Sequence, residues 1–512
     1  MLSSNFNQLP QNPPALLPEY EVPPEKRAYY AFLQSYPGYG DTDRLDNLRR
    51  AEYGRLDRAK HIYLDYTGGG LHADSQLTRH MEMLNQGVFG NPHSANPTSQ
   101  AMTQLVEEAR KAVMRYFNAS SREYVCVFTP NATGALKLVG EAYPFAPGGR
   151  YLLTFDNHNS VNGIREFARQ QGADISYVPL TTPDLRIDRQ ILSEALSNKS
   201  NNQPSLFAFP AQSNFTGVKH PLTLVEEAQQ KGWDVLLDAA SFVPTNRLDL
   251  RQVKPDFVTL SFYKMFGYPT GVGALFIKKS TLLKLNRPWF AGGTVNFATV
   301  QGDGHHLAED EAAFEDGTIN YLSIPAVKIG LEHMRQVGLD EISERIRCLT
   351  GWLIEQLLAM RHSNDKPMVR IYGPTSTVMR GGTLTLNFYD PDGLLIDYRR
   401  IEELANGYNI SLRTGCFCNP GAGEIAEGLT SEDMLAGLDA EGEMNLMRFM
   451  QIIEGRGQKS AGAIRVSMGI VTNFHDIYEF IEFAKAFKDQ TKLSLGSASF
   501  DIEGCRVIRE KN

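Results

Sequence analysis

Short, fully apolar segments alternate with helix-like segments between Asp65 and Lys279. Alternation of this kind predicts a mainly parallel, doubly wound α/β sheet, and fully apolar strands indicate that helices cover both of its faces. Segments such as Gly134–Tyr143 and Asn162–Gln171 are the expected helices. The expected strands cover Tyr124–Thr129, Tyr151–Phe155, Asp174–Pro179, Ser205–Phe209, Asp234–Leu237, Phe257–Leu260 and Val272–Ile277.

The pattern changes after Ile324, where longer helices and alternating strands predict a second, smaller α+β domain. A long helix is expected over Pro325–Val337, continuing through Arg347–Leu358. Six prolines among the first 24 residues predict an extended arm, because proline fixes φ and lacks an amide donor. We therefore predict an N-terminal arm with short helices (1–60), a large domain (61–330), a small C-terminal domain (331–495) and a tail (496–512).

Composition restricts the class of function. The 512 residues include 51 Lys and Arg against 59 Asp and Glu, which gives a net charge of −8. No basic block is present, so neither a nucleic-acid partner nor an anionic membrane surface is expected. No apolar stretch approaches the roughly 18 residues of a membrane helix, and the N-terminus does not resemble a signal peptide. Five cysteines are too few and too odd in number for a disulfide framework, which favours a reduced, cytoplasmic compartment.

Three polar motifs follow expected strands. Lys264 ends one strand and precedes a glycine-rich segment, Asp238 ends another, and Asn131 and Thr133 join a strand to a helix. Each motif alone has an ordinary interpretation as a solvated lysine, a turn aspartate or a helix cap. Ligands of α/β proteins bind at the carboxyl edge of the sheet. A desolvated lysine, a carboxylate for a pyridinium nitrogen and a phosphate cradle at that edge together predict a pyridoxal phosphate site.

The order of these motifs, together with longer strings, resembles the class V aminotransferase group of fold-type I pyridoxal phosphate enzymes, which includes the cysteine desulfurases. The longer strings are more similar to the desulfurase-type domain of molybdenum cofactor sulfurases. The likeness runs from about residue 60 to about residue 490, and those sulfurases continue into a second module that a chain ending at Asn512 is expected to lack. The strings are Gly90–Ser94, Pro210–Gly217, Asp238–Phe242, Ser261–Lys264, Phe314–Thr318 and Arg413–Asn419.

The resemblance implies a role for each matching residue. Lys264 would bind the cofactor covalently, Asp238 would pair with the ring nitrogen, and Asn214 would lie near the ring hydroxyl. His158 would stack on the ring and carry protons, with Ala240 on the opposite face. Tyr263 stands where many simple desulfurases have histidine, and Arg465 and Arg413 are the expected substrate-binding residues. The phosphate would be held by Ala132, Thr133 and Ser261, with Thr318 arriving from a partner subunit.

Cys416 and Cys418 decide the expected reaction. A Cys-x-Cys pair can form half of a metal site, but no second pair at ligand spacing accompanies it, so no metal is predicted. By the resemblance, Cys418 is the persulfide-forming cysteine, whereas the role of Cys416 stays open. The surrounding glycines predict an exposed, mobile loop. Cys126, Cys348 and Cys505 are expected to be ordinary thiols, and His305–His306 with the acidic run Glu309–Glu315 is expected to be a solvated loop.

These observations predict a homodimeric pyridoxal phosphate enzyme that converts L-cysteine to L-alanine and forms a persulfide on Cys418 for a sulfur-acceptor protein. Selenocysteine or another amino acid remains open as substrate. One alternative keeps the cofactor but makes the chain an aminotransferase, epimerase or C–S lyase for another amino acid. A second alternative is a non-catalytic interaction protein on the same scaffold, because one fold hosts many functions.

Overall fold

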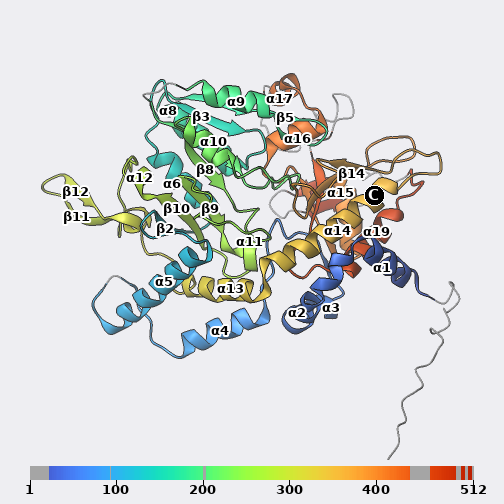
Figure 1. The fold of residues 1–512 in the computed structure, drawn as a ribbon, viewed down its shortest axis with the longest axis horizontal. Coiled ribbons are helices and arrows are strands. Elements are labelled where there is room, and N and C mark those ends of the chain that lie inside the picture. The colour runs from blue at the N-terminus through green and yellow to red at the C-terminus, as the bar shows by residue number, and fades with distance from the viewer. Residues whose placement is uncertain are drawn as a thin grey trace, which may run out of the picture.

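A seven-stranded sheet forms the centre of the large domain (Figure 1). The computed structural model describes residues 22–92, 94–199, 203–438, 460, 462–491, 498–501 and 506–509. Neighbouring strands are parallel except that β10 runs antiparallel to both β2 and β9. The predicted mainly parallel α/β architecture is therefore confirmed. In spatial order the strands are β2 (Tyr124–Thr129), β10 (Gly273–Lys278), β9 (Phe257–Ser261), β8 (Asp234–Asp238), β7 (Ser205–Pro210), β3 (Arg150–Thr154) and β4 (Asp174–Val178).

The two faces of this sheet are covered by different helices. Successive strand residues point to opposite faces, so Val125 and Val127 pack in one core with α6 (Ala132–Ala142) and α8 (Ile164–Gln170). Cys126 and Phe128 pack in the other core, which contains residues of α5 (Pro97–Tyr116) and α13 (Ile324–Val337). All six residues of β2 are buried. Burial on both faces explains why the strands are apolar without alternation.

The carboxyl ends of β2 and β9 meet at one edge of the sheet. Because β2 and β9 are both antiparallel to β10, they point in the same direction, and Gly273 at the start of β10 pairs with Thr129 and with Ser261. A Cβ atom at Gly273 would lie 2.7 Å from the backbone of Asn131. Glycine therefore lets the segment after β2 cross closely over the start of β10. That crossing brings the start of α6 beside α11 (Phe262–Phe266), which follows β9.

The smaller sheet is antiparallel, in the order β13 (Val369–Tyr372), β14 (Thr383–Phe388), β17 (Ala463–Ser467) and β16 (Arg413–Gly415). The expected single long helix is wrong: α13 ends before Gly338, and α14 (Leu339–Ala359) begins after it. Gly338 has a φ of 89°, which breaks the helical path and which L side chains rarely adopt. The last helices of this domain are α15 (Tyr398–Gly407), α16 (Pro420–Glu427), α17 (Ser431–Leu438) and α19 (Phe474–Lys485).

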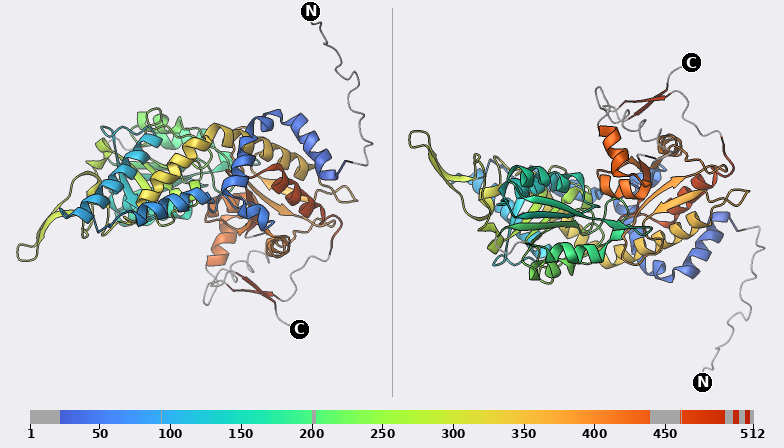
Figure 2. Two further views of the ribbon diagram at one scale, coloured as in Figure 1. Left: turned by 90° about the horizontal axis from the view of Figure 1, so that it is seen from below. Right: turned by 90° about the horizontal axis from the view of Figure 1, so that it is seen from above.

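Two connections link the N-terminal segment to the C-terminal domain. Strand β1 (Ile62–Tyr63) pairs in parallel with β15 (Ile410–Ser411), and Asp65 forms an isolated bridge with Ser467. The first helices lie beside α14 and α19 (Figure 2). The predicted domain boundaries stay predictions, and the expected extended arm falls mostly outside the described residues. These first helices are α1 (Pro24–Ser35), η2 (Pro37–Thr42), α2 (Arg44–Glu52) and α3 (Arg55–Arg58).

The remaining elements are short. No helix within the described residues is long and apolar enough to cross a bilayer. The hairpin of β11 (Val295–Thr299) and β12 (Gly304–Leu307) projects from the large domain (Figures 1 and 2). The others are α4 (Asp74–Asn85), α7 (Asn159–Asn162), β5 (Leu180–Thr181), β6 (Arg186–Ile187), α9 (Arg189–Ser197), α10 (Leu224–Gln230), α12 (Lys279–Leu282), η3 (Asp310–Phe314), β18 (Ala498–Asp501) and β19 (Arg506–Arg509).

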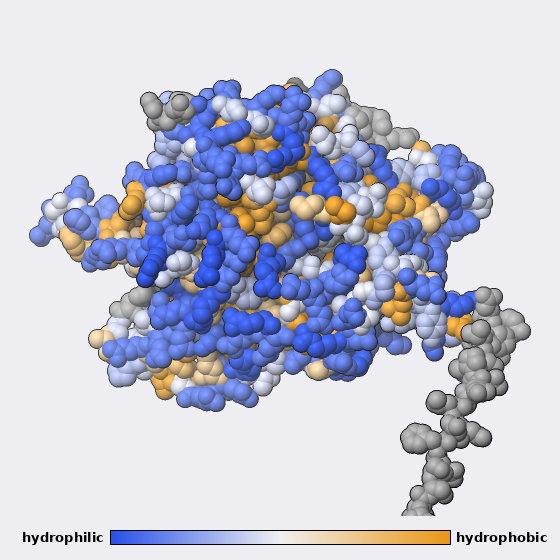
Figure 3. Space-filling model, in the orientation of Figure 1, coloured by the Kyte–Doolittle hydropathy of each residue, from blue (hydrophilic) through white to orange (hydrophobic). Residues whose placement is uncertain are grey.

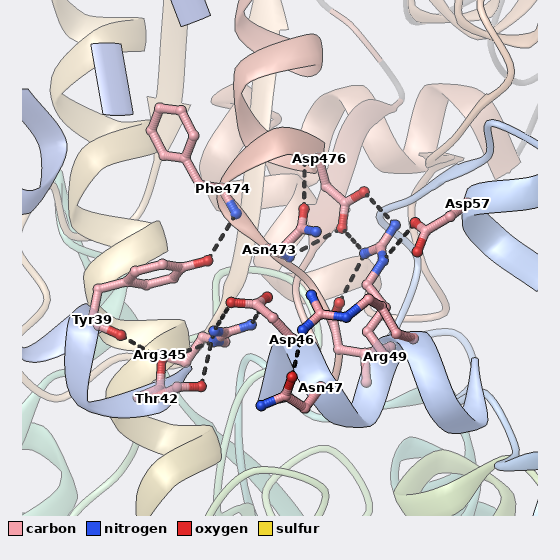
Figure 4. Close-up of polar contacts among 12 residues, drawn as sticks. Tyr39, Thr42, Asp46, Asn47, Arg49, Asp57, Arg345, Asn473, Phe474 and Asp476 are labelled. Atoms are coloured by element: carbon pink, nitrogen blue, oxygen red, sulfur yellow. Dashed lines mark hydrogen bonds and ion pairs between the residues drawn. The ribbon is translucent and has the colours of Figure 1, made fainter. Parts of the chain in front are cut away.

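Two buried arginines join the N-terminal helices to the C-terminal domain (Figure 4). Arg345 of α14 is fully buried and donates to both carboxylate oxygens of Asp46, at 2.7 and 2.8 Å, and to the carbonyl of Thr42 at 2.9 Å. Arg49 of α2 donates to the Asp476 carboxylate of α19 at 2.5 and 3.1 Å. Its Nε also donates to Asp57 at 2.9 Å. The first helices are therefore fixed to the small domain by charge pairs as well as by apolar packing.

Replacing Asp476 by alanine is expected to lower the free energy of unfolding by about 3 kcal/mol, because a buried guanidinium would lose its carboxylate. Asp57→Ala is the matched control: Asp57 pairs with the same arginine, but its side chain is 49% exposed against 2% for Asp476. That change should cost at most about 1 kcal/mol. Urea unfolding measures the free energy of unfolding of both variants. Equal losses would contradict the claim that the buried Arg49–Asp476 pair stabilises the fold more than the exposed Arg49–Asp57 pair does.

Candidate active site

A cavity of about 170 Å³ opens at the carboxyl edge of the large sheet. Every residue expected to contact the cofactor lines it, except Thr318. The residues come from the ends of β8 and β9 and from segments near the starts of α6 and α7. They meet because the carboxyl ends of the strands lie at one edge of the sheet. The cavity is lined by Asn131, Ala132, Thr133, Leu136, His158, Ser160, Pro210, Gln212, Asn214, Asp238, Ala240, Ser241, Ser261, Tyr263 and Lys264.

Burial controls the charge of the two bases in this cavity. Desolvation lowers the pKa of Lys264, and the Asp238 carboxylate offsets only part of that effect. The pKa of His158 is also lowered, mainly by desolvation. The Asp238 carboxylate opposes this shift, and the positive charges of Lys264 and Arg465 add to it. Nδ1 of His158 accepts from the Ser160 amide at 3.1 Å, so the neutral ring carries its proton on Nε2. The cavity therefore favours a neutral amine and a neutral imidazole.

Hydroxyl groups and backbone amides gather at the start of α6. Asn131 caps this helix by accepting from the Gly134 amide at 2.9 Å, and the Ala132 amide donates to Ser261 Oγ at 2.9 Å. Thr133 Oγ1 lies 2.8 Å from Ser160 Oγ. A helix N-terminus with several donors is suited to a phosphate group. Ser160 was not predicted from the sequence, although it lies only two residues after His158.

Arg465 lies buried beside the cavity, between an aspartate and the backbone of Asn214. Its guanidinium donates to the carbonyl of Asn214 at 3.0 Å and to Asp65 Oδ1 at 3.1 Å, whereas its buried Nε has no hydrogen-bond partner among the described residues. Asp65 also accepts from Arg413, at 2.7 Å to Nη2. Desolvation lowers the pKa of Arg465 to about 10, the opposing effect of Asp65 being smaller. Two arginines sharing one aspartate leave a net positive charge that suits a carboxylate ligand. Asp65 was missed in the sequence, where it resembles an ordinary strand-end residue.

The segment that carries the two cysteines is a tight turn. The Asn419 amide donates to the carbonyl of Cys416 at 3.0 Å, and Phe417 and Cys418 both have a φ of 54°. Asn419 is fully buried, and α16 begins directly after it. The predicted exposed, glycine-rich loop is therefore wrong for Asn419 and for the helix that follows. Among the residues of this turn only Cys416 and Cys418 are exposed, as free thiols.

This thiol turn, Cys416–Asn419, is hydrogen-bonded to the segment that carries His158. The Asn159 amide, next to His158, donates to the carbonyl of Cys418 at 2.7 Å. A thiolate at Cys418 raises the pKa of Lys264 and Arg465 by its charge, which indicates that this sulfur lies near both. By contrast, Cys126 is buried, and desolvation raises its pKa to about 12. The Cys418 thiol therefore lies near the basic groups of the site.

Asn214 has a contact that its predicted role did not include. Its Nδ2 donates to the carbonyl of Phe417 at 2.8 Å, and its Oδ1 accepts from Asn419 Nδ2 at 2.8 Å. Asn214 also lines the cavity, so one amide side chain links the cavity to the thiol turn. The second hydrogen of Nδ2 is not used in these contacts. The predicted position of Asn214 near the ring hydroxyl of a cofactor stays a prediction.

Two sequence predictions fall outside the cavity. Thr318 is exposed and lines a neighbouring cavity of about 390 Å³ with Gly134 and Asp316. Its predicted contribution to a partner's site stays a prediction. His305 and His306 lie in strand β12 and not in a loop. The ring of His305 stacks on Phe290, and that of His306 is tilted against Phe297.

The residues of the cavity fit pyridoxal phosphate. A neutral lysine amine can react with an aldehyde, the carboxylate of Asp238 can pair with a protonated ring nitrogen, and the start of α6 offers donors for a phosphate. The unpartnered Nε of Arg465 leaves a donor for the carboxylate of an amino acid. The aldehyde, ring nitrogen and phosphate of the cofactor and the carboxylate of an amino-acid substrate thus each have a chemically matching group.

Comparisons with known proteins agree with this chemistry. A family model described as "Aminotransferase class-V" matches residues 62–480. A molybdenum cofactor sulfurase of Solanum lycopersicum is 37% identical over 496 residues, which cover 90% of this chain and 59% of that protein. The chain therefore spans little more than half the length of this relative.

Solved structures share the fold at lower identity. The apo cysteine desulfurase of Thermococcus onnurineus has a TM-score of 0.69 at 21% identity, covering 86% of this chain and 97% of that one. A C-DES variant with glycine covalently linked to the pyridoxal phosphate cofactor has a TM-score of 0.64 at 19% identity, covering 86% and 99%. These two likenesses indicate the fold, a fold-type I scaffold.

Proposed function

The chain belongs to the class V aminotransferase family, and from that premise we propose that it is a pyridoxal phosphate-dependent cysteine desulfurase. It would convert L-cysteine to L-alanine and leave the sulfur as a persulfide on Cys418. One observation carries this proposal more than any other. The carbonyl of Cys418 accepts a hydrogen bond from Asn159, which holds a free, exposed thiol at the cavity that contains Lys264 and Asp238.

The cofactor would be held by the residues whose chemistry matches it. Lys264 would bind its aldehyde carbon, Asp238 would hold a proton on its ring nitrogen, and Ser261 and Thr133 would bind its phosphate with the first amides of α6. His158 and Ala240 would lie on opposite faces of the ring, with Tyr263 beside it. When bound, pyridoxal phosphate supplies an electron sink that stabilises negative charge on the substrate carbons.

Lys264 and His158 would move the protons. A neutral Lys264 amine can take the proton from Cα of the bound amino acid and later return a proton to the substrate. Because burial lowers its pKa, more of this amine is neutral at a given pH than in an exposed lysine. Activity should therefore fall as the pH falls through the lowered pKa of Lys264. The Nε2–H of His158 is the neighbouring proton donor.

Cys418 would take the sulfur. Its thiolate attacks the sulfur of the bound cysteine, a new S–S bond forms, and the Cβ–S bond of the substrate breaks. The electron pair stays on Cβ, which takes a proton and leaves as the methyl group of L-alanine. The cysteine thus loses its sulfur atom, and Cys418 gains it as a persulfide. Arg465 would hold the substrate carboxylate with its unpartnered Nε, since a planar guanidinium can bind a carboxylate through two donors. Arg413 would add positive charge beside it.

A homodimer is part of the proposal. The projecting hairpin and the segment before it expose large apolar side chains: Phe297 (56%) in β11, and Trp289 (49%) and Phe290 (42%) just before it. Hydrophobic residues are visible at its base in Figure 3. A two-stranded hairpin alone is marginally stable in water, so docking on a second copy would stabilise it. Such docking would also bring Thr318, which lies 11 residues after the end of the hairpin at Leu307, near the partner's phosphate site. Sedimentation equilibrium measures the oligomeric state.

A reduced, cytoplasmic compartment and a separate sulfur-acceptor protein complete the proposal. The four described cysteines are all free, which is the state that the thiol chemistry needs. The acceptor would have to reach the thiol turn, where both sulfurs are exposed.

One experiment tests the proposed reaction. The holoenzyme is incubated with L-cysteine, and both L-alanine and protein-bound sulfur are measured by mass spectrometry. Equal amounts of alanine and of sulfur on the thiol turn are expected in the first turnover. Formation of pyruvate or another keto acid without protein-bound sulfur would contradict the proposal and favour a lyase or an aminotransferase.

A further inference from the structure

The thiol turn places bulky residues in an unusual conformation. Phe417 and Cys418 occupy the two central positions of a four-residue turn, both at a φ of 54°. This is the pattern of a type I′ turn, whose central positions favour Gly, Asn and Asp because positive φ is unfavourable for other residues. A backbone of this kind persists only where the surrounding structure holds it, and such positions cluster at functional sites.

Each carbonyl of the segment Cys416–Cys418 has a hydrogen-bond donor. Cys416 accepts from the Asn419 amide at 3.0 Å, Phe417 from Asn214 Nδ2 at 2.8 Å, and Cys418 from the Asn159 amide at 2.7 Å. Asn419 itself is anchored, because its Nδ2 donates to the carbonyl of Asp156 as well as to Asn214. The donors come from three separate parts of the chain. The backbone of the turn is therefore fixed from several sides.

The ring of Phe417 fixes the turn further. It is 7% exposed, its centre lies 5.4 Å from the ring centre of Phe215, and the Arg465 guanidinium lies 4.8 Å above it. Moving the turn outward would expose this ring and would remove the packing on Arg465. Cys418 is consequently held at the cavity and is not free to carry sulfur away on a swinging loop.

The second thiol lies at the other end of the same turn. Positions one and three of such a turn have Cα atoms about 5–6 Å apart, because each Cα–Cα step is about 3.8 Å and the chain bends between them. Disulfide bonds span Cα separations of about 4.4–6.8 Å. Cys416 is exposed and free, as Cys418 is. The backbone separation within this turn therefore allows the two sulfurs to approach each other.

We propose that Cys416 is a second sulfur-carrying residue, which takes the sulfane sulfur from Cys418 and presents it to the acceptor. The inference rests on the proposed function, since it requires a persulfide on Cys418. The Cys416 thiolate attacks the outer sulfur of that persulfide, a new S–S bond forms on Cys416, and the S–S bond at Cys418 breaks. The electron pair returns to Cys418 as a thiolate. No oxidant or reductant is consumed, and Cys418 is free for the next substrate.

No other described cysteine can take this role. Cys126 and Cys348 are both buried, and desolvation raises the pKa of each to about 12. A thiol with such a pKa is almost entirely protonated at neutral pH and is a poor attacking group. Within the part of the chain that the structure describes, Cys416 is therefore the only exposed thiol besides Cys418.

The test compares Cys416→Ser with the unchanged holoenzyme. After incubation with L-cysteine, persulfides are alkylated, and fragment-ion sequencing of the peptide that spans the turn locates the sulfur. The unchanged enzyme should carry sulfur on both cysteines, and Cys416→Ser on Cys418 alone, with the same first-turnover yield of alanine. Transfer to a polyethylene glycol thiol too large to enter the cavity should fall by about tenfold, whereas transfer to dithiothreitol should change little.

Two results would overturn the relay. One is the absence of sulfur on Cys416 together with unchanged transfer from Cys416→Ser to the large thiol, and the other is a loss of first-turnover alanine in this variant. Cys416→Ala provides a second variant if the serine change unfolds the turn, and the visible band of the bound cofactor reports folding in both. Failure of the proposed function looks different, because Cys418→Ser would then still form alanine.

Discussion

Lys264→Ala is expected to eliminate the visible absorption band of the bound cofactor and to abolish alanine formation. The lysine is the one amine in the cavity that can bind the cofactor's aldehyde carbon, and its lowered pKa makes it a base as well. Loss of the proton transfer alone should lower the turnover number by about 10²- to 10⁴-fold. Loss of covalent binding should decrease it further. Absorption spectra and the rate of alanine formation from L-cysteine measure the two effects.

Lys219→Ala is the matched control for this change. Burial lowers the pKa of Lys219 as well, but this lysine does not line the cavity. Its removal should leave both the visible band and the turnover number within about twofold of the unchanged enzyme, because a general base must lie within hydrogen-bond reach of its proton. A visible band that survives in Lys264→Ala, or disappears in Lys219→Ala, would contradict the assignment of Lys264.

The strand-end residues of the site could be predicted from the sequence because topology alone places them. Parallel strands end at one edge of a sheet, so Asp238, Ser261 and the start of α6 meet there whatever their side chains contact. The antiparallel strand β10 does not change this result. Because β2 and β9 are both antiparallel to β10, they run in the same direction, and their carboxyl ends lie at the same edge. The apolar segments of the sequence predict the strands, and the ends of these strands predict where the site lies.

The residues that hold the site together could not be predicted in this way. Asp65 lies 400 positions before Arg465, to which it is bonded, and no local pattern relates the two. Asn214 was assigned by resemblance to the cofactor ring, yet its amide also bonds the thiol turn. The glycines near Cys418 indicated a mobile loop, because local composition does not reveal that Phe417 is buried between Phe215 and Arg465. Contacts between distant segments decide these positions, and only the folded chain shows them.

Cys418→Ser is expected to retain the bound cofactor and its visible band while losing alanine formation from L-cysteine by at least about 10³-fold, as when another enzyme loses its nucleophile. The serine hydroxyl is nearly isosteric, so the turn that Asn159 and Asn214 hold should persist. A hydroxyl, however, is not a nucleophile toward thiol sulfur at neutral pH. Exchange of the Cα proton of L-alanine in D₂O, which needs Lys264 but no thiol, should continue at an unchanged rate.

Cys416→Ser is the matched control, since it makes the same substitution two residues earlier in the same turn. If Cys418 accepts the sulfur of the substrate and Cys416 only passes it on, the two variants differ at the first turnover. Cys418→Ser forms neither alanine nor a persulfide, whereas Cys416→Ser forms one equivalent of each. Alanine formed at the normal rate by Cys418→Ser would mean that a thiol other than Cys418 accepts the sulfur, whereas pyruvate formation would indicate a C–S lyase. The Cys418 thiol, whose charge acts on Lys264 and Arg465, would then not be the site of sulfur transfer.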